Sequence, residues 1–186
     1  MKKIYIMLSY TGTAPSKVIK LFSKEKYSHV SIALDSQLKE LYSFARKKVN
    51  NPFIGGFIKE DINGGIYKKF ENTKCYIYSL EVTDEQYETI SNIIKDFEIK
   101  KHNLHYNMIG LLGVLVNVPI ERRNHYFCSQ FVSEVLLKSG VLNFNIPSAL
   151  VQPTHFYNMK DKDVVYTGLL RDYSDGINYS YSTAAI

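Results

Sequence analysis

The sequence predicts an α+β fold with a mostly antiparallel sheet packed on helices. Segments with alternating apolar residues, the pattern of half-buried strands, gather mainly in the first half of the chain. Segments whose apolar residues recur every three or four positions, as in amphipathic helices, lie mainly in the second half. Because strands and helices occur in separate blocks, an antiparallel sheet is favoured over a parallel one.

The expected strands cover residues 4–8, 28–34, 39–46, 75–82 and 164–167. In the second of these, Val30 and Ile32 point to one face of the strand and His29 points to the other. Asn50, Pro52 and the glycine pairs at 55–56 and 64–65 indicate a long irregular connection over residues 49–65.

The expected helices cover residues 15–23, a segment that begins after residue 83, residues 108–116 and residues 128–139. Pro15 suits the first position of the first helix. Thr83 and Gln86 have the spacing of a capping box, which marks the start of the second. Residues 108–116 are nearly all apolar, so we expect that helix to be buried. Gly140 ends the last helix.

The 186 residues suit a single domain over 1–186, with a Tyr-rich flexible tail over 172–186. The net charge of +5 is scattered along the chain, so we expect no nucleic-acid partner. Two cysteines exclude a disulfide scaffold and a Cys-rich zinc site, and we expect neither a metal nor a cofactor. The chain shows neither an apolar run long enough to cross a membrane nor a signal-peptide core, so we expect a cytoplasmic protein.

Cys128 is the first candidate for a functional residue, because it lies at the expected start of a helix. The N–H groups and partial positive charge of a helix N-terminus stabilise a thiolate and can bind an oxyanion. Position alone favours the alternative of a small buried apolar side chain. Cys75 lies within an expected strand, and we interpret it as a packing residue.

A nucleophilic cysteine requires a base, and His29 on its strand is the first candidate. His125, three residues before Cys128, is a weaker one. His102 and His105 have a spacing that metal ligands also show, but nothing nearby in the sequence completes such a site.

A third polar residue should orient the base. A two-residue turn at Asp35 and Ser36 would place Tyr42 opposite His29, with Glu40 on the same face. A three-residue turn would place Ser43 there instead. Tyr42 is therefore the expected orienting residue, and Glu40 and Ser43 are the alternatives.

Several segments together resemble a known family. They are Tyr27–Leu34, Leu41–Arg46, Tyr106–Gly110, Tyr126–Val132 and Gly140–Val141, within a likeness that runs from about residue 4 to 171. The order of a His strand, a Tyr-Ser-Phe strand and an aromatic-Cys-Ser-Gln-Phe-Val helix is similar to the circularly permuted, papain-like branch of the NlpC-type cysteine hydrolases, the YiiX/YaeF-like amidases. In that family the catalytic histidine precedes the cysteine, as His29 precedes Cys128.

The resemblance implies a papain-like fold and hydrolysis of an amide through a Cys-His acyl-enzyme, with Cys128 as nucleophile and His29 as base. The family often has His, Glu, Asn or Gln where this chain has Tyr42. The expected substrate is a small peptide, amide or ester, and a membrane contact is not favoured. Two alternatives stay open: a lipid-acting acyltransferase or phospholipase, with Phe53, Ile54, Phe57 and Ile58 as its apolar surface, and a non-enzymatic binding module. The sequence sets no oligomeric state.

Overall fold

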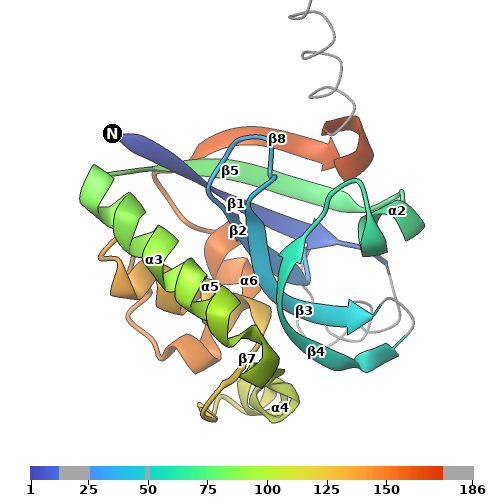
Figure 1. Cartoon of the computed structure of the whole chain (residues 1–186), viewed down its shortest axis with the longest axis vertical. Coiled ribbons are helices and arrows are strands. Elements are labelled where there is room, and N and C mark those ends of the chain that lie inside the picture. The colour runs from blue at the N-terminus through green and yellow to red at the C-terminus, as the bar shows by residue number, and fades with distance from the viewer. Residues whose placement is uncertain (13–25, 49–50, 174–186) are drawn as a thin grey trace, which may run out of the picture.

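A computed structural model describes residues 1–12, 26–48 and 51–173, and the side chains of residues 48 and 51–54 lie outside the described part. The protein is a mixed α+β structure built on an antiparallel six-stranded sheet (Figure 1). The strands in spatial order are β4 (Asn51–Glu60), β3 (Leu41–Lys48), β2 (His29–Ala33), β1 (Lys2–Tyr10), β5 (Lys74–Val82) and β8 (Asp163–Leu169). A second sheet pairs the short strands β6 (His105–Tyr106) and β7 (His125–Tyr126) in parallel.

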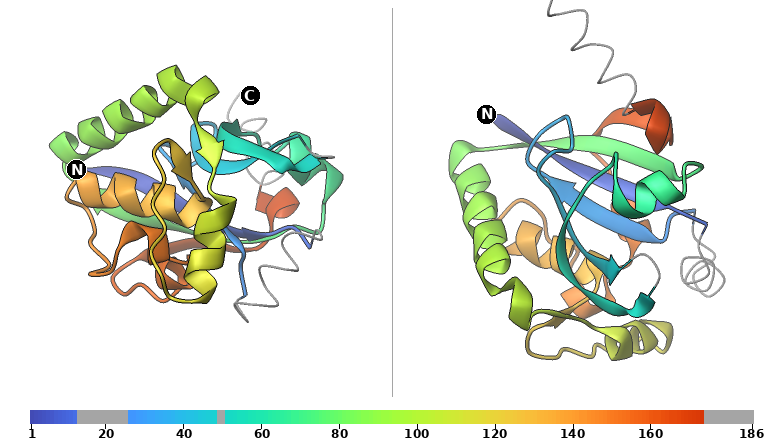
Figure 2. Two further views of the ribbon diagram at one scale, coloured as in Figure 1. Left: turned by 90° about the horizontal axis from the view of Figure 1, so that it is seen from below. Right: turned by 45° about the vertical axis from the view of Figure 1, so that its right-hand side comes forward.

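The helices are α2 (Gly65–Lys69), α3 (Asp84–Lys100), α4 (Met108–Leu115), α5 (Cys128–Lys138) and α6 (Pro153–Tyr157), with single 3₁₀ turns at Lys101–Asn103 and Ser148–Leu150. Figure 2 shows α3 and α5 lying along the sheet and α4 projecting at one end of the molecule. The expected helix over 15–23 and most of the expected tail lie outside the described residues. Within that tail, the Tyr173 ring packs at a tilt against Tyr166, and its hydroxyl donates a hydrogen bond to Ser36 O.

The alternating strand pattern divides the core into two clusters, one on each face of the sheet. On one face, Ile32 and Phe44 pack under α3 and α5. Phe44 lies at the centre of an aromatic group there, with ring centroids 5.0 to 5.9 Å from those of its four neighbours. On the other face, Met7 and Ile77 pack with Tyr67 of α2. Helices on both faces of the sheet therefore pack against the same central strands.

Helix α3 begins where its sequence signal predicts. Gln86 N donates to Thr83 Oγ1 over 3.1 Å, and Thr83 N donates to Gln86 Oε1 over 2.9 Å, which completes the capping box. The expected strands 4–8, 28–34, 39–46, 75–82 and 164–167 are confirmed as β1, β2, β3, β5 and β8, with shifted ends. The helix expected over 128–139 is confirmed as α5.

The expected irregular connection over 49–65 is wrong, because most of it forms strand β4. Gly55 and Gly56 serve close approach rather than a turn. A Cβ on Gly55 would lie 2.8 Å from Tyr106 Cβ, and one on Gly56 would lie 2.6 Å from Leu104 O. The segment before α4 therefore crosses directly over β4, and side chains at these positions would block it.

The expected burial of the helix at 108–116 is also wrong. Helix α4 forms there, but its apolar side chains at Met108, Ile109, Leu112 and Leu115 are exposed, and so is Val116 directly after it. Helix length and apolar content do not separate a buried helix from one whose apolar face lies in solvent. No helix in the described part of the chain is long and apolar enough to cross a bilayer.

Candidate active site

Cys128 is the first residue of helix α5, and its residue surface is only 5% exposed. The preceding residue, Phe127, provides no side-chain cap, so the first N–H groups of the helix are left to other acceptors. Helix α5 packs against β2 and β3, with Phe131 and Val132 in the core cluster. This packing fixes the N-terminus of the helix, and with it the sulfur, beside the strand that carries His29.

His29 is the first residue of β2, and its side chain is 20% exposed. Hydrogen bonding and charge between His29 and Cys128 lower the pKa of the thiol and raise that of the imidazole, so the two side chains lie close together. Its Nε2 lies 2.8 Å from Glu60 Oε1, so Nδ1 is the ring nitrogen that remains for the sulfur. The imidazole therefore lies between a thiol and a carboxylate, the order that an activated nucleophile requires.

Burial disfavours the charged forms of both Cys128 and His29. The interaction between the two side chains outweighs burial, and it shifts both pKa values toward the charged forms. Desolvation raises the pKa of Cys128, whereas hydrogen bonding and charge from His29, with the backbone N–H groups of Val30 and Ser129, bring it below its ordinary value. Desolvation lowers the pKa of His29, but the charges of Glu60 and Cys128 raise it well above 6.5. The site thus favours a thiolate–imidazolium pair.

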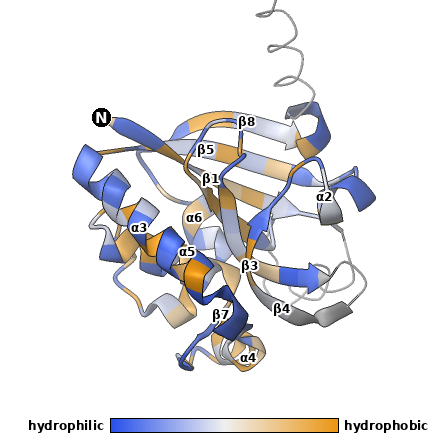
Figure 3. Ribbon diagram, viewed as in Figure 1, coloured by the Kyte–Doolittle hydropathy of each residue, from blue (hydrophilic) through white to orange (hydrophobic). Residues whose placement is uncertain are grey.

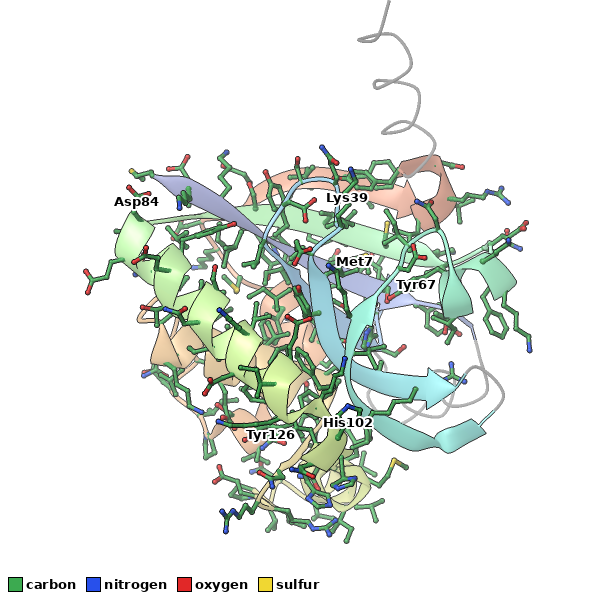
Figure 4. All side chains as sticks on the ribbon, viewed as in Figure 1. Met7, Lys39, Tyr67, Asp84, His102 and Tyr126 are labelled. Carbon is green, nitrogen blue, oxygen red and sulfur yellow. The ribbon has the colours of Figure 1, made fainter. Side chains whose placement is uncertain are left out.

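Glu60, the last residue of β4, is the carboxylate that completes this chain of groups. Its side chain is 4% exposed. Besides His29, Ser31 Oγ donates to Oε1 over 2.9 Å, Ser43 donates to the same oxygen, and Tyr67 OH of α2 donates to Oε2. Tyr67 packs in the same buried cluster as Met7, and Figure 4 labels both. Each carboxylate oxygen therefore has a donor, as a buried anion requires.

The partners of Glu60 hold it ionised. Desolvation raises its pKa, but the charge of His29 and the hydrogen bonds from His29, Ser43 and Tyr67 outweigh burial and lower it. Glu60 lies in the segment that the sequence pattern marked as irregular. In the sequence Glu60 stands between Lys59 and Asp61, as an ordinary surface carboxylate would, so no local pattern singles it out.

The structure separates Tyr42 and Glu40 from His29. The expected two-residue turn at Asp35 and Ser36 is wrong, since Leu34 N donates to Glu40 O and Tyr42 pairs with Ile32. The Asp35 carboxylate accepts backbone N–H bonds across this longer turn, including one from Glu40 N over 2.7 Å. Tyr42 OH donates instead to Glu40, which also binds Lys59. The register brings Ser43, the other alternative, beside Glu60, and its hydroxyl donates a hydrogen bond to the Glu60 carboxylate.

Tyr106 is a further residue of the site that the sequence pattern did not single out. Burial and the negative charge of Cys128 both raise the pKa of its hydroxyl well above its usual range. The close packing of Gly55 under its Cβ fixes the start of its side chain. Tyr106 therefore lies close enough to Cys128 to feel its charge, and its hydroxyl keeps its proton at neutral pH.

The remaining candidates lie apart from this group. Cys75 is buried in β5, where burial raises the pKa of its thiol to about 12. His125 is bonded through Nδ1 to Arg123 O and stacks near His105 at 5.1 Å. No cluster of three or more metal-ligating side chains occurs among residues 1–12, 26–48 and 51–173. Phe57, expected on an apolar outer surface, is buried against Phe44.

No protein-family model matches the sequence, and comparison with curated proteins finds no significant match.

Proposed function

We propose that the protein is a cysteine hydrolase of the papain-like, permuted NlpC type, which cleaves an amide through an acyl-enzyme on Cys128. One observation carries this proposal: three side chains, Cys128, His29 and Glu60, lie close together inside the protein, with His29 between the other two. Such an arrangement supplies a nucleophile, a base and an orienting carboxylate. The resemblance of the His29 strand and the Cys128 helix to that family supports the same conclusion.

In the proposed reaction the Cys128 thiolate attacks the carbonyl carbon and forms a C–S bond, while the carbonyl π electrons move to oxygen. The backbone N–H of Cys128, one of the first N–H groups of α5, donates to that oxyanion. The C–N bond then breaks, and the His29 imidazolium gives its proton to the leaving amine. Water hydrolyses the thioester, with His29 as the base, and a carboxylic acid leaves as the thiolate returns.

Glu60 acts in this proposal by holding His29 and not by touching substrate. Its hydrogen bond with Nε2 holds the ring and leaves Nδ1 as the ring nitrogen available to the sulfur. Its negative charge favours the imidazolium that accompanies the thiolate. Glu60 is thus a positioning residue in the role that the sequence pattern assigned to Tyr42.

Acyl-enzyme trapping tests the proposal. On incubation with p-nitrophenyl acetate as an ester probe, intact mass spectrometry should detect one acetyl group, and peptide mapping should place it on Cys128. Cys128→Ala should lose the adduct, whereas Cys75→Ala, the matched control at the other cysteine, should keep it. An adduct that persists in Cys128→Ala with unchanged release of p-nitrophenol would overturn the assignment.

The second candidate, acyl transfer or hydrolysis on lipids by the same Cys-His chemistry, is favoured by the exposed apolar side chains of α4. The binding-module alternative is disfavoured by the lowered pKa of Cys128, which a module has no need to maintain. Release of p-nitrophenol from long-chain but not from acetyl esters would select the lipid candidate.

A further inference from the structure

Helix α4 and the turn after it present an apolar surface to solvent, which we call the α4 ridge. Its members are Met108 (46% exposed), Ile109 (48%), Leu112 (62%), Leu115 (49%), Val116 (68%) and Val118 (50%). The helical members recur at three- and four-residue spacing and so lie along one side of α4. In a globular protein the apolar side of a surface helix normally faces the core, whereas in α4 it faces solvent.

Small residues and a buried asparagine hold α4 in this orientation. Gly110 and Gly113 face the protein, and a Cβ on Gly113 would lie 2.4 Å from Val118 O. Asn107 is fully buried, accepts a hydrogen bond from Gly110 N over 3.0 Å and donates to Ile120 O over 3.0 Å. These contacts leave no room for a larger side chain at Gly110 or Gly113, so the buried side of α4 is made by its glycines and the large side chains lie on the outer side. The exposure of the α4 ridge is therefore built into the fold.

Basic residues border the ridge. Arg122 and Arg123 follow it in the chain, are exposed, and make no side-chain hydrogen bond or ion pair with any residue that the structure describes. Lys101 is also exposed, and Glu121 is the sole acidic residue between positions 99 and 126. Figure 3 shows the apolar helix beside the hydrophilic segment around β7, and in Figure 4 the labelled His102 lies at this same end of the molecule.

We propose that the α4 ridge docks the protein on an anionic lipid surface. Apolar side chains that project from a helix flanked by arginine and lysine are the features of interfacial membrane binding, in which the apolar face enters the headgroup region and the cations contact lipid phosphates. A second copy of the chain is a poorer occupant. Self-association across the ridge would bring the unpaired Arg122 and Arg123 of both copies together without compensating acids.

Docking in this way would bring the candidate active site close to the bilayer. Tyr106, which lies near Cys128, is the residue before Asn107, and Asn107 caps α4. Strand β8 lies at the opposite end of the molecule from α4 (Figure 2, right). The inference concerns the surface alone and does not depend on hydrolysis, so Cys128→Ala should bind vesicles as the wild type does.

Vesicle flotation of the full chain tests the docking. Wild type should float with vesicles of equal parts phosphatidylcholine and phosphatidylglycerol and stay unbound with pure phosphatidylcholine. Leu112→Glu combined with Val116→Glu should lower the apparent affinity at least about tenfold, because carboxylates replace inserted apolar side chains. Val164→Glu, at a 55% exposed position on β8, is the matched control and should bind as wild type does. Circular dichroism checks that each variant is folded.

Arg122→Ala combined with Arg123→Ala tests the charge contribution by itself. Each arginine near an anionic surface contributes about 1 kcal/mol, so the pair should weaken binding about thirtyfold. Absence of wild-type flotation with the anionic vesicles, or equal binding by the ridge variant, overturns the proposal. Concentration-dependent dimers in sedimentation that the ridge variant abolishes, without vesicle binding, would assign the ridge to a second copy instead.

Discussion

Glu60 Oε1 lies 2.8 Å from His29 Nε2, although 31 residues separate the two in the chain. The pair is held from both sides: β2 carries the histidine, β4 carries the glutamate, and β3 lies between them in the sheet. Ser31 and Ser43, from β2 and β3, donate to the same carboxylate. The position of the base is therefore a property of three strands together.

Replacing Glu60 by Gln should raise the pKa of Cys128. The neutral amide removes the charge that favours the His29 imidazolium, and a weaker imidazolium stabilises the thiolate less. The midpoint of iodoacetamide alkylation against pH should move upward by about one unit or more. Glu40→Gln is the control, since Glu40 bonds Tyr42 and Lys59 but not His29. An unchanged midpoint in Glu60→Gln would show that Glu60 does not act through His29.

The two cysteines should differ in alkylation of the wild-type protein. The pKa of Cys128 is below its ordinary value, whereas burial raises that of Cys75 to about 12. At neutral pH, mass spectrometry after limited iodoacetamide treatment should find modification on Cys128 alone, because the thiolate is the reacting form. Preferential labelling of Cys75 in the folded protein would contradict the electrostatic description of both sites.

Tyr67→Phe and Tyr42→Phe separate the observed orienting group from the one expected from the sequence. Tyr67 OH donates to Glu60 Oε2, so its loss leaves a buried carboxylate oxygen unpaired and should lower kcat about tenfold. Tyr42 OH donates only to Glu40, and its loss should change kcat by less than about twofold. Rates with p-nitrophenyl acetate and the alkylation midpoint measure both variants. A larger loss in Tyr42→Phe would restore the expected role of Tyr42.

The Glu60–His29 pair should stabilise the fold most strongly between pH 4.5 and 6.5. The folded pKa of His29 is raised, so its contribution is complete below 6.5 and is lost as pH rises through the folded value. The folded pKa of Glu60 is lowered, so its contribution is complete above 4.5 and is lost as pH falls through the folded value. Thermal melts across pH should show the largest Tm difference between wild type and Glu60→Gln in this window. A difference that does not vary with pH would contradict the coupling.

Phe44→Ala should destabilise the fold by about 3–5 kcal/mol, because it leaves a cavity among packed aromatic rings. Phe44 is fully buried and contacts Phe57, Phe97 and Phe131 from β4, α3 and α5. Urea denaturation measures the free energy of unfolding. Val164→Ala, at an exposed position, should change it by less than about 0.5 kcal/mol. A loss below about 1 kcal/mol for Phe44→Ala would show that the aromatic group is not the centre of the core.

Local patterns predicted the elements that depend on neighbouring residues. The capping box of Thr83 and Gln86 forms α3 at its expected start, and the apolar stripe after Cys128 forms α5. Both signals are read from residues within one or two turns of each other, so they can be recognised in the sequence without knowledge of the rest of the fold. The alternation around Val30 likewise identified the strand that carries His29.

Contacts between residues far apart in the sequence have no local pattern that predicts them. The turn between β2 and β3 is longer than two residues because the Asp35 carboxylate caps it, and this extra length moves Tyr42 opposite Ile32. A change in turn length alters every facing pair in a hairpin. Strand β4 was hidden by Gly55 and Gly56, which are present because another segment crosses them and not because the chain turns there.

Cys128 and His29 could be identified as candidates from the sequence, because a helix start and a strand position are local features of the chain. The tertiary structure alone brought Glu60 to His29, since that contact depends on the pairing of β4 with β3 and of β3 with β2. It also placed the apolar side of α4 in solvent and its two glycines, Gly110 and Gly113, on the buried side, where there is no room for larger side chains. Hydrophobicity shows which residues favour burial, whereas the space left by the rest of the chain decides which of them are buried.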